Sequence, residues 1–218
     1  MRTVFDRNLD ELHREVIAMG VLVNRAIAKA TEAFLTFDVE VAQDVIDGDT
    51  RINDIEHAID KKCHEVIAMQ HPNASDLRRV IAVLKASSNL ERMGDHAASI
   101  AKLTIDTKDK KSNTELESLI FDLAEEVLFM SNDIIDAFVD FDVDAAYEIA
   151  KRDRKVDERY AAVRNHAIES MMADPETVYA SSEYSFIGMH LERIGDYVTN
   201  ICESIIYLDS GTVVDLKR

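Results

Sequence analysis

The sequence predicts an all-α protein made of two pseudo-symmetric antiparallel three-helix bundles. Its 218 residues include only six Gly and two Pro, which favours long helices with few turns. Apolar residues recur in steps of three and four, and there is no strand-like alternation of useful length. A six-residue motif also occurs twice, so the chain reads as one helical unit used two times.

The repeated motif is Leu-Glu-Arg-Met-Gly-Asp at residues 90–95, which returns 101 residues later as Leu-Glu-Arg-Ile-Gly-Asp at 191–196. A second pattern, Phe-x-x-Phe-Asp-Val, occurs at 34–39 and again at 138–143, an offset of 104. Because the two offsets nearly agree over a long span, we interpret the halves as tandem repeats.

The first half predicts three helices. Asp38 is the expected N-cap of the second helix, and Ser75 that of the third. Pro72 separates these two helices, because the residue before a proline disfavours the α region. Gly48 is a predicted interruption of the second helix. The expected ranges are about 5–37, 38–69 and 75–106.

The second half repeats this plan after segment 106–114, which has no apolar residue and is the best linker candidate. We therefore place the repeat units at residues 1–108 and 109–218. Asp142 is the expected cap of the fifth helix, Pro175 follows its end, and Ser210-Gly211 ends the last. The expected ranges are about 116–141 and 142–172, and the sixth helix carries the apolar residues from Ile187 to Leu208.

The composition excludes several classes of protein. With 42 acidic and 25 basic residues, the net charge of −17 opposes binding to nucleic acid or to a bare anionic membrane. It is compatible with cations and with basic protein surfaces. Cys63 and Cys202 stand singly, and neither a signal peptide nor a membrane-spanning run is visible. We expect a cytoplasmic protein with reduced thiols.

The repeated motif places two carboxylates on one helix face. Glu91 and Asp95 are four residues apart, as are Glu192 and Asp196, so each pair is separated by about one helical turn. Two carboxylates at that spacing repel each other unless a cation or a proton lies between them.

Counting outward from the two proline turns places a second polar pair level with each acidic pair. All-oxygen clusters of this kind suit Mg, Ca, Mn or Fe ions. Gly94 and Gly195 would allow the neighbouring helix to approach closely. The first cluster is Asp49, Asn53, Glu91 and Asp95, and the second cluster is Asp153, Asp157, Glu192 and Asp196.

Other interpretations stand beside a metal site. An acidic helix face is commonly just solvated, which would make the protein a metal-free scaffold. A ferritin-like di-metal redox enzyme would use Glu-x-x-His pairs, but no Glu lies three residues before any of the seven histidines. We therefore expect no enzymatic activity. We interpret each histidine as a lone surface or boundary residue, and Met69, Met171 and Met172 as core residues at the bundle tips.

Together these motifs resemble the PhoU family of phosphate-uptake regulators. The resemblance rests on residues 90–96 and 191–197, on Pro72-x-x-x-Asp-Leu-Arg78 with its apolar continuation to Lys85, and on the final helix at 200–207. It covers the chain from about Phe5 to Gly211.

The resemblance implies a cytoplasmic all-α negative regulator, active when phosphate is plentiful and often a homodimer. Such a protein connects the ATPase subunit of the phosphate-specific ABC transporter with the phosphate-sensing histidine kinase, and it meets the membrane only through these partners. The resemblance also implies multinuclear iron or zinc clusters. Carried over by position, their Glu/Asp-x-x-x-Asp motifs are Glu91/Asp95, Asp153/Asp157 and Glu192/Asp196, whereas Asp49 with Asn53 departs from the acidic pattern.

Overall fold

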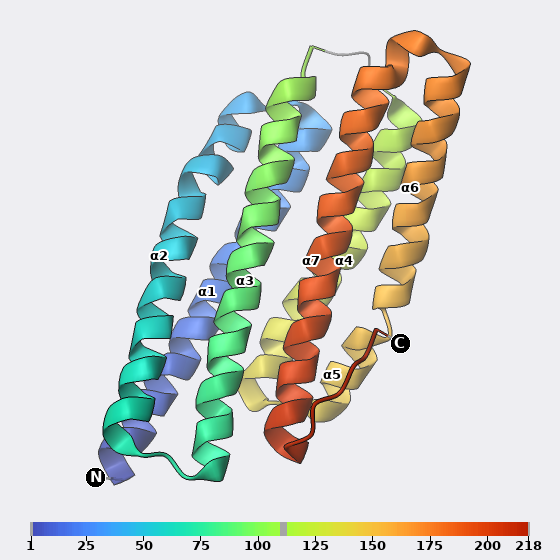
Figure 1. Ribbon diagram of the computed structural model, residues 1–218. Coiled ribbons are helices and arrows are strands. Elements are labelled where there is room, and N and C mark those ends of the chain that lie inside the picture. Colours follow the sequence, from blue (N-terminus) through green and yellow to red (C-terminus); the bar gives the residue numbers. More distant parts are fainter. Residues whose placement is uncertain (1, 110–112, 218) are drawn as a thin grey trace.

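The computed structural model describes residues 2–109 and 113–217, and this part of the chain is helical without strands (Figure 1). The predicted all-α fold is therefore confirmed. None of the described helices is both long and apolar enough to cross a membrane. The elements are α1 Arg2–Thr36, α2 Val39–Gln70, α3 Ala74–Thr107, α4 Thr114–Asp140, α5 Val143–Ala150, α6 Asp153–Ala173, the 3-10 helix η1 Pro175–Thr177 and α7 Val178–Ser210.

The two repeats form two helical bundles that lie side by side. Helices α1, α2 and α3 pack together, and α4, α5, α6 and α7 make the second group (Figure 1). Across the boundary, α3 packs along α7 and α1 packs along α4. Of the predicted linker 106–114, residues 110–112 lie outside the described residues, and the flanking residues extend α3 and begin α4.

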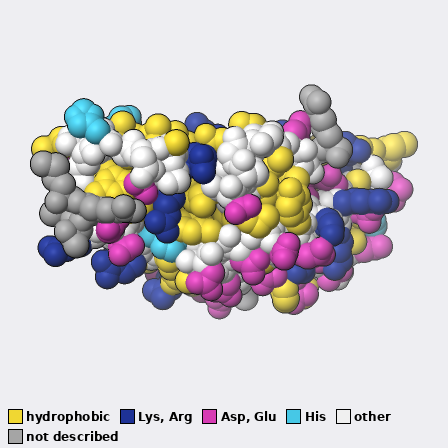
Figure 2. Space-filling view, turned by 90° about the horizontal axis from the view of Figure 1, so that it is seen from below, with side chains coloured by type: hydrophobic (Ala, Val, Ile, Leu, Met, Phe, Trp, Pro, Cys, Tyr) yellow, Lys and Arg dark blue, Asp and Glu magenta, His cyan; other side chains and the backbone are white. Residues whose placement is uncertain are grey.

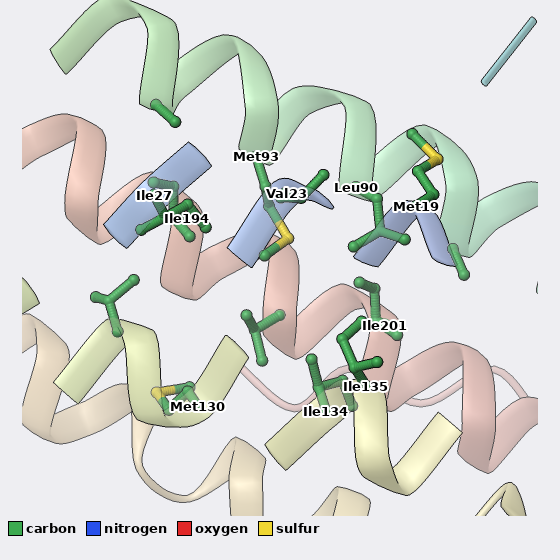
Figure 3. Close-up of a cluster of buried hydrophobic side chains, with 14 of the residues drawn as sticks. Met19, Val23, Ile27, Leu90, Met93, Met130, Ile134, Ile135, Ile194 and Ile201 are labelled. Carbon is green, nitrogen blue, oxygen red and sulfur yellow. The ribbon is translucent and has the colours of Figure 1, made fainter. Parts of the chain in front are cut away.

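A single aliphatic core runs through both repeats. Its close packing is visible at Gly20 of α1, where an added Cβ would clash with Ile135 of α4. Burial of this apolar surface holds the repeats together. Figure 3 shows the centre of the core, where four helices contribute Met19, Val23, Ile27, Leu90, Met93, Met130, Ile134, Ile135, Ile194 and Ile201.

The turns after α1 and α4 are built alike. Phe37 and Phe141 both have φ of 52°, a left-handed conformation that costs about 1–2 kcal/mol for a non-glycine residue. Asp38 and Asp142 follow them and cap α2 and α5 as predicted, accepting hydrogen bonds from backbone N–H groups of the first turn. The sequence repeat at 34–39 and 138–143 is thus a repeated corner.

The predicted continuous helix over 142–172 is wrong, because the chain breaks between α5 and α6 at Lys151 and Arg152. Arg152 turns toward α4, where its Nε donates to Glu126 Oε1 at 2.8 Å and its guanidinium lies 4.1 Å from the centre of the Phe129 ring. The equivalent position in the first repeat is Gly48, which has no side chain to form such contacts. There α2 continues, so the predicted interruption at Gly48 is also wrong.

Three smaller predictions have different outcomes. The cap of α3 is Asn73 instead of Ser75, because Asn73 Oδ1 accepts from the backbone N–H groups of Ser75 and Asp76. Met69 and Met172 are 76% and 81% exposed, since they lie on the solvent side of the last turns of α2 and α6; they are not core residues. The predicted glycine stop is confirmed at Gly211.

Both cysteines are buried free thiols, as expected. Burial raises the pKa of Cys63 and of Cys202 to about 12. Since the thiolate is the reactive form, we expect both side chains to react slowly with thiol reagents in the folded protein.

Candidate metal-binding site

The first cluster lies where α2 and α3 run side by side. An added Cβ at Gly94 would lie 3.2 Å from two carbons of Ile52 and 3.6 Å from Asp49 Oδ1. Gly94 therefore admits α2 at close range, as predicted, and Asp49 lies directly across from it. Because Asp95 follows Gly94 in the chain, the carboxylates of Asp49 and Asp95 come into the same region.

The side chains of the first cluster are partly withdrawn from water and affect one another. Burial raises the pKa of Asp49, and the Asp95 carboxylate raises it further. Burial and then Asp95 also raise the pKa of Glu91. Asn53 Nδ2 donates to Asp49 Oδ2 at 3.4 Å, but Asp49 Oδ1 and Asn53 Oδ1 are buried without a hydrogen-bond partner. Such an unpartnered oxygen costs about 1–3 kcal/mol, which a bound cation would relieve.

The second cluster repeats this geometry between α6 and α7. An added Cβ at Gly195 would lie 3.2 Å from Val156 Cγ1 and 3.4 Å from Asp153 Oδ1. Val156 and Asp153 thus occupy the positions that Ile52 and Asp49 hold in the first repeat. The break before α6 does not disturb this register.

Electrostatic strain is larger in the second cluster. Burial raises the pKa of Asp153 to about 6, with further contributions from Asp157 and Asp196. Burial and then Asp196 raise the pKa values of Asp157 and Glu192. The charge of Asp196 therefore acts on the other three predicted carboxyl groups of this repeat.

Two cations neutralise Asp196: Arg193, whose place in the repeated motif makes it a candidate, and Lys217, which the sequence pattern does not indicate. Arg193 Nη1 donates to Asp196 Oδ2 at 2.9 Å, and its Nε lies 3.6 Å from Glu192 Oε2. Lys217 Nζ, from the C-terminal segment, donates to Asp196 Oδ1 at 2.6 Å. Arg193 lies three residues before Asp196, a spacing that places both on one face of α7, whereas Lys217 belongs to no periodic pattern.

The oxygen atoms of these side chains suit a divalent cation, although the side chains are not placed so that they surround one. Among the described residues, no three His, Cys, Asp or Glu side chains are placed so that they could hold a metal ion as they stand. Free carboxylates repel one another, so they separate unless a cation draws them together. The fit therefore rests on the paired carboxylates and on the unpartnered oxygens of Asp49 and Asn53.

His96 and His190 form a contact that no spacing in the sequence indicates. Their Nδ1 atoms lie 2.8 Å apart across the seam between α3 and α7, and Tyr197 stacks on His96 with ring centres 5.6 Å apart. Burial lowers the pKa of both rings, that of His190 to about 4. Interpreting these two as lone histidines was wrong, because residues 94 positions apart meet only in the folded chain.

Comparisons with known proteins agree with this architecture. The PhoU domain family model matches residues 16–104 and again 120–205. The chain is 38% identical over 217 residues to the phosphate-specific transport system accessory protein PhoU homolog of Clostridium acetobutylicum, covering 99% of both chains.

Two solved structures share the fold. The crystal structure of the phosphate transport system regulatory protein PhoU from Streptococcus pneumoniae has a TM-score of 0.90 and 36% identity, with 97% of this chain and 99% of that chain covered. The crystal structure of PhoU from Pseudomonas aeruginosa has a TM-score of 0.92 and 33% identity, covering 95% and 100%. Both repeats of the sequence and the whole helical fold match, and the chain belongs to the PhoU family.

Proposed function

We propose that this chain is the accessory regulator of a phosphate-specific transport system and that it works as a non-enzymatic adaptor. The observation that carries the proposal is the full-length match to relatives named accessory or regulatory proteins of phosphate transport. The match spans both repeats, each with its own acidic motif.

The partners we propose are the ATPase subunit of the phosphate transporter and the phosphate-sensing histidine kinase, met at the cytoplasmic face of the membrane by a homodimer of this chain. The surface charge supports protein partners over nucleic acid. The net charge is −17, and acidic side chains gather along one edge of the end shown in Figure 2. A groove beside α4 and α5 is lined by Asp133, Asp136, Asp140 and Glu148, which complements a basic protein surface.

The proposal includes divalent cations, iron or zinc among them, at the two acidic clusters. Asp49, Asn53, Glu91 and Asp95 would hold the first, and Asp153, Asp157, Glu192 and Asp196 the second. A bound cation supplies positive charge that cancels carboxylate repulsion. These residues would then fix α2 against α3 and α6 against α7, and so set the helix faces that partners meet.

The regulatory role is tested in a host whose own gene has been deleted. Expression of this chain at high phosphate is expected to silence a phosphate-starvation reporter. A quadruple variant, Glu91→Gln, Asp95→Asn, Glu192→Gln and Asp196→Asn, is expected to fold but to lose repression. A native chain that leaves the reporter fully active would contradict the regulatory proposal. Full repression by the quadruple variant would remove only the metal-dependent part.

Elemental analysis tests the clusters directly. Protein purified without chelator is expected to contain stoichiometric divalent metal, which the quadruple variant lacks while keeping its helical circular dichroism. Absence of metal in both proteins would leave a metal-free helical scaffold that acts through protein contacts alone. Oxidation of ferrous iron by the native protein would instead favour the di-metal redox enzyme.

A further inference from the structure

The C-terminal segment, residues 211–217, is held against the second cluster. After α7 ends at Ser210, this segment turns back toward the start of α6 (Figure 1). The Leu216 N–H donates to Glu203 Oε1 at 2.9 Å, and the side chains of Val214 and Leu216 pack against the core. Backbone and apolar contacts therefore hold the segment in place independently of Lys217.

These contacts position the Lys217 ammonium group beside the carboxylates of the second cluster. Its Nζ lies 2.6 Å from Asp196 Oδ1, and the Lys217 side chain is 33% exposed. The charge of Lys217 also acts on the carboxyl groups of Asp153 and Asp157, whose pKa values it lowers against the raising effect of burial. Lys217 thus faces three of the four members of the cluster.

Among the residues that the structure describes, the first cluster has no cation in direct contact: the charges of Lys102 and Arg92 lower the pKa values of Asp49 and Glu91 against the raising effect of burial, but without an ion pair. In the described ranges 2–109 and 113–217, no Lys or Arg forms an ion pair with any of its carboxylates, whereas Asp49 Oδ1 and Asn53 Oδ1 are buried without a partner. Two clusters with the same backbone register therefore differ in their ion pairs, and also in Asn53, which stands where the second cluster has Asp157. The first presents open oxygen atoms, and the second is closed by the chain's own ammonium group.

We propose that the C-terminal segment is a built-in competitor for the second cluster, and that a divalent cation enters there only by displacing Lys217 and releasing residues 211–217. The first cluster fills directly, and the second fills afterwards. This inference rests on the proposed cation binding and adds to it an order of filling. Whether the segment is bound or released then depends on whether a cation occupies the second cluster. A partner protein can distinguish these two states of the segment.

Competition predicts a measurable change in affinity. The apparent affinity of a site is reduced by the fraction of molecules in which it is closed. A partly exposed ion pair of about 1 kcal/mol closes the site enough to weaken binding about fivefold. Titration of the chelator-treated protein with Mn²⁺ is therefore expected to show one tighter and one weaker site. Lys217→Gln should tighten the weaker site about fivefold and leave the other unchanged.

A matched control removes the same charge elsewhere. Lys29 on α1 pairs with Asp44 at 3.6 Å on the surface of the first bundle, so Lys29→Gln is expected to leave both Mn²⁺ affinities unchanged. Circular dichroism melting should show that both variants stay folded, because neither lysine is a core residue.

A second measurement follows the segment itself. Val213 is 76% exposed, and the native thiols are buried with raised pKa values, so Val213→Cys offers a single accessible thiol for a fluorophore. Fluorescence anisotropy of this label is expected to stay constant while the tighter site fills and to fall as the weaker site fills. In the Glu192→Gln, Asp196→Asn background, Mn²⁺ should cause no such fall.

The outcomes separate the two proposals. Two Mn²⁺ sites with affinities unaffected by Lys217→Gln, or a label that stays immobile when both sites are filled, would overturn the competitor and keep the clusters. No Mn²⁺ bound by either the native protein or Lys217→Gln would overturn the clusters and the competitor together.

Discussion

Replacing Asp153 by asparagine should stabilise the metal-free protein at neutral pH. Burial, Asp157 and Asp196 raise the pKa of Asp153 from an ordinary 3.8 to about 6. A difference of about two pH units corresponds to about 3 kcal/mol. Because the carboxyl group keeps part of its contact with water, we expect about half of this, so Asp153→Asn should raise the free energy of unfolding by about 1.5 kcal/mol at pH 7.5.

The pH dependence gives this prediction its sign. Between pH 3.8 and about 6 the folded state holds a proton on Asp153 that the unfolded chain has released. The contribution of Asp153 to stability therefore falls as pH rises through this window and is constant above it. The advantage of Asp153→Asn should accordingly be small near pH 4, grow up to pH 6 and then level off.

Urea unfolding at several pH values, with chelator present, measures the difference between variant and native protein. Taking the difference cancels the other carboxyl groups, which titrate in both proteins. Asp54→Asn, on the exposed side of α2, is the control and should change stability by less than about 0.5 kcal/mol at every pH. An Asp153→Asn variant that is less stable at pH 7.5, or an advantage independent of pH, would refute the reasoning.

Three further predictions concern helix packing and a buried ion pair, and urea unfolding measures each of them. Gly94→Val should cost about 2–3 kcal/mol, since even a Cβ there would lie 3.2 Å from Ile52. Gly48→Ala should instead stabilise α2 by about 0.5–1 kcal/mol, because no atom lies within 4 Å of an added Cβ. Equal effects at the two glycines would contradict the close approach of α2 to α3 at Gly94. Arg152→Ala should cost about 1–2 kcal/mol, because Glu126, 4% exposed, loses the guanidinium that binds it at 2.7 Å. Lys155 and Arg159 also pair with Glu126, and an unchanged stability would show that these two suffice.

The sequence by itself determined the repeat and the main course of the helices. Apolar residues at helical spacing must face a core, and this requirement is local enough to be read from the pattern. The caps at Asp38 and Asp142 were also predicted, because the bonds they form reach only two or three residues along the chain. Counting from the proline turns was enough to place Asp49 opposite the motif that contains Gly94.

Only the tertiary structure decided where a helix breaks and which distant side chains meet. The break at Arg152 depends on Glu126, and the histidine pair depends on α3 meeting α7. Lys217 lies in the second cluster because the C-terminal segment turns back along α7, so two clusters with similar sequences differ in charge. Periodicity records which face of a helix is buried, but it carries no information about which distant side chain arrives to neutralise a buried charge.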